Sequence, residues 1–337
     1  MTTSSPTMPA EWEPHQRSFM AWPCRDSLWG SAAALGRARF AYAAVARAIT
    51  RFEPVTMIAN PEQAQAARAA CGDAVTISAH AIDDSWIRDT GPSFVRLGQG
   101  ELAGVCWRFN GWGGKYTPHD KDARIAGVIL DELGIARHPA ALTAEGGALH
   151  VDGAGTLLTT EQCLLNSNRN PGMGRDQVED VLKKQLGVSK IIWLAEGLSG
   201  DETDGHIDNV ACFSAPGRVL LQGCADPADA NYPIVAANRA CLNAALDARG
   251  NRLEIVELPA PKPRNDKNGN RLTLSYINFY LVNGGLIMPS FDDPADAPAR
   301  QILADMFPGR ELVQVPALDI VQGGGGIHCI TQQMPAV

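Results

Sequence analysis

One cysteine in the sequence has surroundings that favour chemistry. Cys329 follows four consecutive glycines in the segment GGGGIHCITQQ, residues 323–333. A run of glycines costs backbone entropy, and it is typical of places where a ligand approaches the main chain closely. Cysteine there can act as a thiolate nucleophile if a positive or proton-accepting group lies beside it. The structural alternative is a tight bend at the corner of a sheet.

The histidine expected to serve this cysteine is His206, in the segment DGHID. His328 is adjacent to Cys329 in sequence, but neighbours along a strand point to opposite faces. The chain has eight cysteines and no CxxC pair, which argues against a zinc-ribbon or thioredoxin-type motif. Cys163 and Cys212 lie in apolar segments and are predicted to be small core residues.

Acidic residues gather in the polar loops of the chain. Carboxylates bind a planar guanidinium through two parallel hydrogen bonds, and a buried charge requires such a partner. The combination therefore predicts a cysteine hydrolase for a cationic, guanidine-like ligand. The acids concerned are Asp83, Asp84, Asp89, Glu145, Asp152, Asp201, Glu202, Asp204 and Asp208.

A rival interpretation comes from two H-x-D pairs, His150–Asp152 and His206–Asp208. Both residues of such a pair face the same side of a strand, which suits a metal-dependent amidohydrolase. This interpretation leaves Cys329 without a role. We therefore expect no metal and no organic cofactor.

The elements that would position these residues recur along the chain. Patterns of helix, strand and polar loop place the loops at Asp89, Glu145, His206, Asn278 and Cys329, with separations of 56, 61, 72 and 51 residues. Such a period indicates a propeller or an array, although a doubly wound sheet is also compatible. Helices are predicted over 31–51, 62–71, 122–133, 175–186, 234–248 and 295–306. Strands are predicted over 55–60, 74–82, 190–196, 253–259 and 311–317, a strand pair over 155–165, and a hairpin over 275–289 that turns at Asn283-Gly284.

Composition narrows the class of protein. The 337 residues carry a formal net charge of −8, and no Lys/Arg cluster offers a face to nucleic acid phosphates. No uninterrupted apolar run approaches the length of a membrane span, and the N-terminus lacks the features of a secretory signal. We expect a cytoplasmic enzyme with no nucleic acid or membrane partner, and the sequence leaves a homo-oligomer open.

Seven segments together resemble the agmatine deiminase family of the guanidine-modifying superfamily, which also includes bacterial-type peptidyl-arginine deiminases and arginine deiminase. They are MPAEWEPHQRSFMAWP, DDSWIRDTGPSF, NGWGGKY, EGGALHVDGAGTLLTTEQCLLNSNRNP, GDETDGHIDN, SYINFYLVNGG and GGGGIHCITQQMP. The resemblance runs from residue 8 to residue 335. It implies an α/β pentein fold, a five-bladed α/β-propeller of ββαβ repeats, in a single domain over 1–337 with a flexible tail over 1–8.

The resemblance also implies roles for individual residues. Cys329 would be the nucleophile that forms an amidino-cysteine intermediate, and His206 the general acid and base. Glu145 would lie beside the histidine, while Asp89 and Asp208 would hold the guanidinium. The expected reaction converts agmatine, a small cationic guanidine, to N-carbamoylputrescine and ammonia. It belongs to putrescine and polyamine biosynthesis.

Other positions are implied less directly by the same resemblance. Trp86 and Trp112 resemble aromatic positions near the substrate, with core packing as the alternative. Some relatives carry aspartate where Glu202 stands, so either Glu202 or the neighbouring Asp201 would contact the substrate. Family members often read GGGNIHC, and Gly326 replaces that asparagine, a change that would loosen the loop or alter one polar contact near the cysteine. Gly326 is also the one feature that favours a catalytically silent pentein that binds a partner, and the intact cysteine, histidine and acids argue against that alternative.

The preferred guanidine depends on the cations in the pocket loops. Free arginine needs a positive group for its α-carboxylate, whereas agmatine has none. Here the loops offer only Arg88 and the less well placed Arg108 and Arg169. This favours agmatine, with peptidyl-arginine and free arginine as alternatives.

Overall fold

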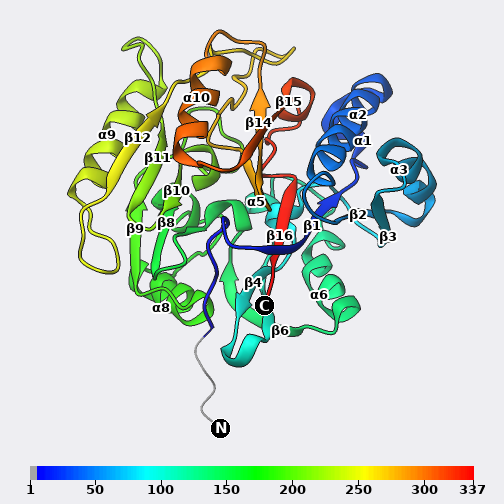
Figure 1. Ribbon diagram of the computed structural model, residues 1–337, viewed down its shortest axis with the longest axis horizontal. Helices are drawn as coiled ribbons and strands as arrows, with labels where there is room; N and C mark the ends of the chain where they lie inside the picture. Colours follow the sequence, from blue (N-terminus) through cyan, green and yellow to red (C-terminus); the bar gives the residue numbers. More distant parts are fainter. Residues whose placement is uncertain (1–5) are drawn as a thin grey trace.

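Five β-sheets with intervening helices make up the protein (Figure 1). The computed structural model describes residues 6–337, apart from the side chain of Gln99. The first sheet has the strand order β16-β1-β2-β3, and each of the others has three consecutive strands. The strands are β1 (His15–Ala21), β2 (Val55–Ala59), β3 (Val75–Ala79), β4 (Ser93–Arg96), β5 (Leu102–Arg108), β6 (Ala136–Thr143), β7 (His150–Val151), β8 (Thr156–Thr160), β9 (Lys190–Leu194), β10 (Ala211–Ala215), β11 (Arg218–Gln222), β12 (Glu254–Leu258), β13 (Tyr280–Val282), β14 (Gly285–Ser290), β15 (Glu311–Pro316) and β16 (Thr331–Pro335).

All five sheets share one pattern of strand pairing. An antiparallel pair comes first, and a crossover then adds a parallel strand on the other side, as in β7-β8-β9. In the first sheet the antiparallel pair joins the two ends of the chain, because C-terminal β16 lies against β1. Strand β3 extends that sheet as a further parallel strand. The topology therefore confirms the repeated α/β unit predicted from the loop spacing.

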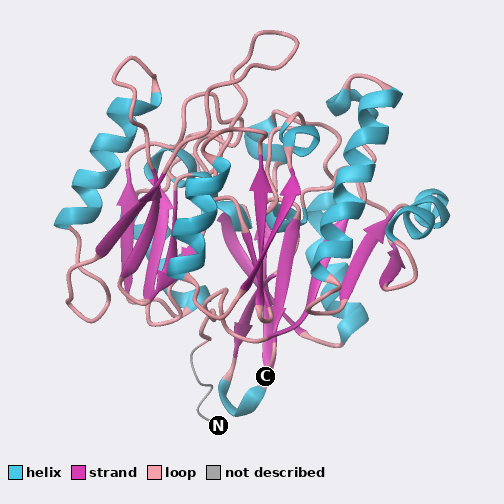
Figure 2. Ribbon diagram, turned by 45° about the horizontal axis from the view of Figure 1, so that its top comes forward, coloured by secondary structure: helices cyan, strands magenta, loops and turns pink. Residues whose placement is uncertain are grey.

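The longer helices form the crossovers between parallel strands. Figures 1 and 2 show α2, α3, α6, α8 and α9 at the periphery, with the strands toward the interior. The helices are α1 (Asp26–Trp29), α2 (Ala32–Ile49), α3 (Ala64–Cys71), α4 (Ile87–Thr90), α5 (Gly111–Gly114), α6 (Asp122–Leu133), α7 (Glu161–Leu164), α8 (Arg175–Leu186), α9 (Asn231–Ala244), α10 (Asp296–Met306) and α11 (Leu318–Val321), with short 3₁₀ turns at Pro61–Gln63, Gly98–Gly100, Gly146–Ala148 and Ile207–Asn209.

Helix α2 shows how the sequence sets these elements. Ser31 accepts a hydrogen bond from the backbone N–H of Ala34 and so caps the first turn. Apolar side chains then recur at helical spacing, and Leu35, Tyr42 and Ile49 are buried in the largest core cluster. The buried stripe holds the helix against the first sheet.

Most predicted elements are confirmed, with boundaries within a few residues. The hairpin turns at Asn283-Gly284 as expected, with Gly284 in the left-handed region at φ +73°. One prediction is wrong: residues 161–164 form helix α7 instead of continuing a strand. The Thr160 hydroxyl accepts a hydrogen bond from the N–H of Cys163, and this cap favours a helical turn over the extended chain.

The predicted tail over residues 1–8 is too long at its C-terminal end. Thr7 pairs with Arg96 through two backbone hydrogen bonds, and the N–H of Met8 donates to the carbonyl of Leu186. Met8 is also buried. Residues 1–5 lie outside the described part of the chain.

None of the helices within residues 6–337 combines the length and the apolar character that a membrane crossing requires. This finding agrees with the apolar runs seen in the sequence.

Candidate active site

The five polar loops meet at one place in the fold. Each loop leaves the last strand of one sheet and leads into the first strand of the next. Contacts between them, described below, bring their side chains together although they are spread over some 240 residues of sequence. All predicted site residues but one come from these connections: Trp86 and Asp89 between β3 and β4, Glu145 between β6 and β7, Asp201, Glu202, His206 and Asp208 between β9 and β10, and Cys329 between β15 and β16. Trp112 comes instead from the crossover between β5 and β6, within one sheet.

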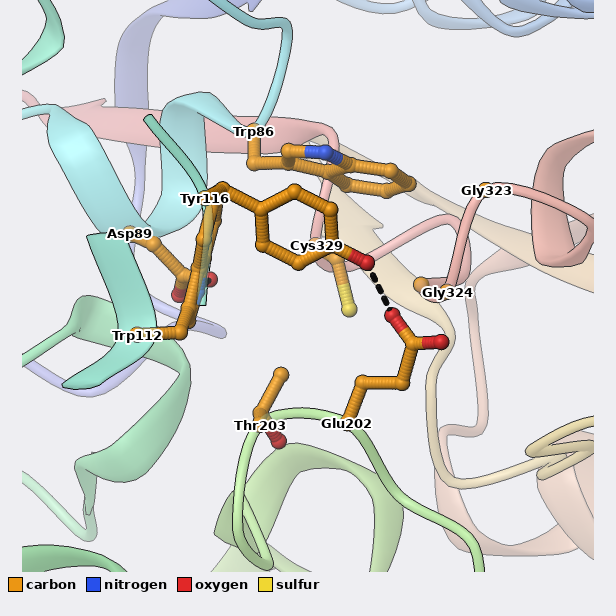
Figure 3. A pocket seen from close by; sticks show the side chains of 10 residues that line it. Trp86, Asp89, Trp112, Tyr116, Glu202, Thr203, Gly323, Gly324 and Cys329 are labelled. Carbon is orange, nitrogen blue, oxygen red and sulfur yellow. Dashed lines mark hydrogen bonds between the residues drawn. The ribbon is translucent and has the colours of Figure 1, made fainter. Parts of the chain in front are cut away.

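A cavity of about 360 Å³, counting its open mouth, lies among these loops (Figure 3). The sulfur of Cys329 points into this space. Cys329 is buried whereas Glu202 is exposed, so the cavity runs from an inner end at the thiol to an outer end at that carboxylate. Its lining consists of Trp86, Asp89, Trp112, Tyr116, Glu202, Thr203, Gly323, Gly324, Gly325 and Cys329.

The Cys329 thiol lies among groups that oppose its ionisation. Its Sγ is 3.4 Å from Oδ2 of Asp208. Burial, followed by the charges of Asp208 and Asp89, raises the pKa of Cys329 well above its ordinary value. With the cavity unliganded, the thiol is therefore neutral, and a bound cation would favour its ionisation.

The glycines before Cys329 make room for two indole rings. A Cβ on Gly323 would lie 2.5 Å from the ring of Trp29, and a Cβ on Gly325 would lie 2.5 Å from the ring of Trp86. Gly324, between them, has φ +98°. The run of glycines is thus needed for close packing under the cavity as well as for the path of the backbone.

We expect Gly325→Ala to lower the free energy of unfolding by about 1–3 kcal/mol, as overpacking does in other cores. The added methyl would also lie 3.0 Å from Cβ of Cys329. Denaturant unfolding measures the change. The matched control is Gly36→Ala, at an exposed helical position with open space around the Cβ, which should stabilise the protein by about 0.5–1 kcal/mol. Equal stability losses in the two variants would contradict this account.

His206 lies buried between two carboxylates. Its Nδ1 is 3.7 Å from Oδ1 of Asp89, and its Nε2 is 3.5 Å from Oε2 of Glu145. Burial alone would lower the pKa of His206, but Asp89, Cys163 and Glu145 outweigh it and hold the pKa well above the ordinary value. The two carboxylates therefore favour the protonated ring, which can donate a proton.

Glu145 is fixed by a second cation. Nε of Arg169 donates to Oε1 of Glu145 at 2.7 Å, and both side chains are fully buried. Burial alone would raise the pKa of Glu145, but His206 and Arg169 outweigh it and lower the pKa. Cys163, predicted to be only core, has its Sγ 3.7 Å from Oε2 of the same carboxylate. No local pattern in the sequence predicts the contact between Cys163 and Glu145.

Asp89 is held by the loops around it. Its Oδ1 accepts from the N–H of Gly147 at 2.9 Å, and its Oδ2 accepts from Nε1 of Trp112 at 2.9 Å. A Cβ on Gly147 would lie within 3.0 Å of His206, Asp89 and Asp208, so the EGG segment admits no side chain there. Burial raises the pKa of Asp89.

Asp208 faces the thiol on one side and an ion-pair network on the other. Its Oδ2 lies 2.9 Å from Nδ1 of His328, whose Nε2 is 2.8 Å from Oε1 of Glu11. Burial alone would raise the pKa of Asp208, but His328 outweighs it and lowers the pKa. Its Oδ1 is buried and has no hydrogen-bond partner within residues 6–337. This oxygen is free to accept from a ligand.

His328 does not line the cavity, as predicted, but the reason is not the alternation of side chains along a strand. It lies in a turn and not on a strand, and its ring is held between Asp208 and Glu11. Glu11 also pairs with Nη1 of Arg88 at 3.3 Å. Glu11 is not among the predicted site residues, because no local pattern around Glu11 links it to a loop more than 300 residues away.

Of the two neighbouring acids, Glu202 lines the cavity and Asp201 does not. Oε2 of Glu202 accepts a hydrogen bond from the hydroxyl of Tyr116 (Figure 3). Oδ1 of Asp201 accepts from the N–H and the hydroxyl of Thr203, at 2.9 and 2.7 Å. Asp201 therefore shapes the loop, and Glu202 is the one that can meet a ligand.

Trp86 and Trp112 both line the cavity and belong to the hydrophobic core. Trp86 lies against Trp29 at 6.5 Å between ring centroids, with 24° between the ring planes. Trp112 stands edge-to-face with Phe109 and Tyr116. Core packing is thus confirmed for both residues, and contact with the substrate stays a prediction.

Four of the loop acids have structural partners away from the cavity. Asp84 pairs with Arg25, and Asp204 with Lys115 and Arg169. Asp83 accepts from the N–H of Lys121. Asp152 accepts from the N–H groups of Ala154 and Thr156, in a turn.

The H-x-D pairs do not form a ligand set for a metal. His150 accepts from the N–H of Phe213, and burial lowers its pKa to about 4. Over residues 6–337, the one group with metal-ligand spacing is Glu145, Cys163 and His206, which lies beside Arg169. The arrangement does not support the metal-hydrolase interpretation.

The fold and the site define a cysteine-containing α/β protein with an acidic cavity suited to a cation. By sequence, the chain belongs to the family described as Porphyromonas-type peptidyl-arginine deiminase, which matches residues 7–335. Among its relatives are the agmatine deiminases of Stutzerimonas stutzeri (strain A1501) and Pseudomonas aeruginosa (strain LESB58), 47% and 46% identical. Each match covers 98% of this chain and 95% of the relative.

Solved structures give the same result. The structure of the agmatine deiminase of Enterococcus faecalis, described as catalysing its reaction, superposes with a TM-score of 0.94 at 34% identity. The match covers 100% of this chain and 99% of that one. The resemblance found in the sequence is confirmed.

Proposed function

We propose that this protein is a hydrolase acting on the C–N bond of a linear amidine, an agmatine deiminase that converts agmatine to N-carbamoylputrescine and ammonia. One observation carries the proposal: a buried thiol at the inner end of an acidic cavity faces Asp208 and lies near Asp89, whose Oδ1 is 3.7 Å from Nδ1 of His206. A guanidinium there would pair with both carboxylates, and the unpartnered Oδ1 of Asp208 supplies an acceptor for one of its N–H groups.

Binding would prepare the nucleophile. The guanidinium brings positive charge beside Cys329, so the thiol proton is released to solvent and the thiolate is stabilised by the bound substrate. Substrate and nucleophile thus become reactive together.

The proposed covalent step uses the Cys329 thiolate and the protonated His206 together. The thiolate attacks the guanidinium carbon, and His206 donates its proton to the departing nitrogen, which leaves as ammonia. The product is an amidino-thioether on Cys329. Glu145 holds the imidazole through the second step and stabilises its charged form.

Hydrolysis then regenerates the site. His206, now neutral, takes a proton from water, and the hydroxide attacks the amidino carbon. The carbon–sulfur bond breaks, the hydroxyl proton returns to the sulfur, and the ureido product leaves. Apart from the thiol proton that passes to solvent, the proton transfers of this route use Cys329 and His206 of this chain.

The outer end of the cavity favours agmatine over free arginine. Glu202 can accept the ammonium at the end of the agmatine chain, whereas it would repel an α-carboxylate. Of the three arginines considered for binding a carboxylate, Arg88 is engaged with Glu11 and Arg169 with Glu145, and Arg108 does not line the cavity. Lys115, whose Nζ lies 2.6 Å from the Glu202 carbonyl, is paired with Asp204.

For the fold, we propose that the five sheets are the blades of a pentein, a five-bladed α/β-propeller in a single domain. The shared strand pattern and the pairing of β16 with β1, which closes the circuit, support this arrangement. The loops between blades would then meet at the central axis, where the thiol lies.

The test is formation of ureido product from agmatine, free arginine and an arginine-containing peptide, measured side by side. Turnover of agmatine well above the other two is expected. Glu202→Gln should raise the KM for agmatine by about fivefold, since an ion pair at the exposed end of the cavity contributes roughly 1 kcal/mol. Turnover of the peptide alone, or of no substrate, would overturn the agmatine assignment.

We expect chelation to leave the activity unchanged, because no step of this route uses a metal. Agmatine turnover is compared before and after prolonged dialysis against EDTA, with added Zn²⁺ as a further arm. Loss of activity on dialysis and its recovery with Zn²⁺ would favour the metal-dependent amidohydrolase instead.

A further inference from the structure

The loop between β12 and β13 contributes a side chain to which the reaction scheme above gives no role. Nδ2 of Asn278 lies 3.2 Å from Sγ of Cys329. Asn278 is buried, and it comes from the only one of the five loops that holds none of the predicted site residues. The position was expected to carry polar chemistry because of its place in the repeat.

Two other contacts fix which end of the Asn278 amide faces the sulfur. Its Oδ1 accepts from the backbone N–H of His328 at 2.8 Å, so the oxygen must point to that N–H. The NH₂ group then faces the sulfur at 3.2 Å, Oδ1 of Asn209 at 3.0 Å and the backbone carbonyl of Asp208 at 3.3 Å, and its two hydrogens are shared among these acceptors. The neutral thiol can in turn donate to Oδ1 of Asn278 at 3.6 Å, whereas a thiolate can only accept from the NH₂ group.

Gly326 gives the amide its space. A Cβ on Gly326 would lie 2.4 Å from Oδ1 of Asn278, so any side chain there would displace the Asn278 amide. The departure of this chain from the GGGNIHC pattern therefore does not leave a gap. The polar group that occupies the space belongs to Asn278.

We propose that Asn278 is the hydrogen-bond donor that holds and stabilises the sulfur of Cys329 as a thiolate. This rests on the proposed function, in which the thiolate must persist beside Asp208 and Asp89. A neutral amide is suited to this task, because it stabilises negative charge without competing with the cationic substrate for the carboxylates. It also aims the sulfur lone pairs toward the cavity.

The test follows the reaction of Cys329 with iodoacetamide, a neutral reagent, against pH and without substrate. Mass spectrometry of the peptide that contains Cys329 gives its rate apart from the other cysteines. The midpoint is the pH at which the alkylation rate reaches half of its maximum. In Asn278→Ala this midpoint should rise by about one pH unit, as loss of a hydrogen bond to a charged group predicts. In Asn278→Asp, which adds a negative charge at the same place, it should rise further.

Turnover provides a second readout. Asn278→Ala should lower kcat for agmatine about tenfold and leave KM nearly unchanged, since the amide contacts the sulfur and does not line the cavity. The matched control is Asn238→Ala in α9, a buried asparagine whose Nδ2 donates to the carbonyl of Glu196. It should lower stability without moving the midpoint.

An unchanged midpoint in a folded Asn278→Ala or Asn278→Asp protein would overturn the proposal. If the alanine variant does not fold, the isosteric aspartate variant decides, together with Gly326→Ala, which displaces an intact Asn278. Because the alkylation needs no substrate, its outcome is independent of whether agmatine is the right guanidine. Failure of the proposed function would instead appear as absence of ureido product from the wild-type protein.

Discussion

Cys329→Ala is expected to lower the turnover of agmatine by about 10⁴-fold or more, to the limit of detection. Covalent catalysis depends on the sulfur, and removal of a nucleophile in other enzymes costs a factor of this order or larger. The variant should still bind agmatine, because Asp89, Asp208 and Glu202 are unchanged. Ureido-product formation measures the loss, and calorimetric titration measures the binding.

Cys212→Ala is the matched control for this variant. Cys212 is also a buried thiol, but it lies in β10 within the hydrophobic core and outside the cavity lining. Its replacement should leave turnover within about twofold. A Cys329→Ala protein that retains a tenth of the wild-type rate would exclude the covalent route.

His206→Asn should lower kcat by about 10²- to 10⁴-fold, the range expected for loss of general acid and base catalysis. The nitrogen would then have to leave as an amide anion and not as ammonia, and water would attack the amidino carbon without a base. The pH profile gives a further readout. Wild-type activity should fall at high pH as the imidazolium, whose pKa is held above its ordinary value, loses its proton. The His206→Asn variant should show no such fall of activity at high pH.

The control for this second variant is His150→Asn, in the other H-x-D pair. Oδ1 of the new asparagine can accept from the N–H of Phe213 as Nδ1 of His150 does. Turnover should be close to wild type. A large loss in His150→Asn, or a rate for His206→Asn within threefold of wild type, would contradict the assigned roles.

The sequence was sufficient to predict the helices, most strands and the loops that carry the site. Helical periodicity ended by glycine is a local signal, and it placed α6 and α8 almost to the residue. The loop spacing then placed Asp89, Glu145, His206 and Cys329 at equivalent positions. Equivalent loops meet only because the five sheets are arranged alike, which the repeat indicated.

What could not be predicted depends on the direction of single side chains. Cys163 was assigned to the core because its neighbours are apolar, yet the capped turn of α7 directs its sulfur to Glu145. Arg169 was weighed as a ligand for the substrate, but Glu145 engages it. Such pairings are set by packing across loops that lie far apart in the sequence, where local patterns carry no information.

The pairing of β16 with β1 has a consequence for synthesis of the protein. Thr331, the first residue of β16, follows Cys329 by two positions and pairs with Met20 near the start of the chain. A ribosome therefore delivers Cys329 and the strand that completes the first sheet together, some 300 residues after β1. A chain cut short by a stop codon before this point would lack both, and β1 would be left without its antiparallel partner.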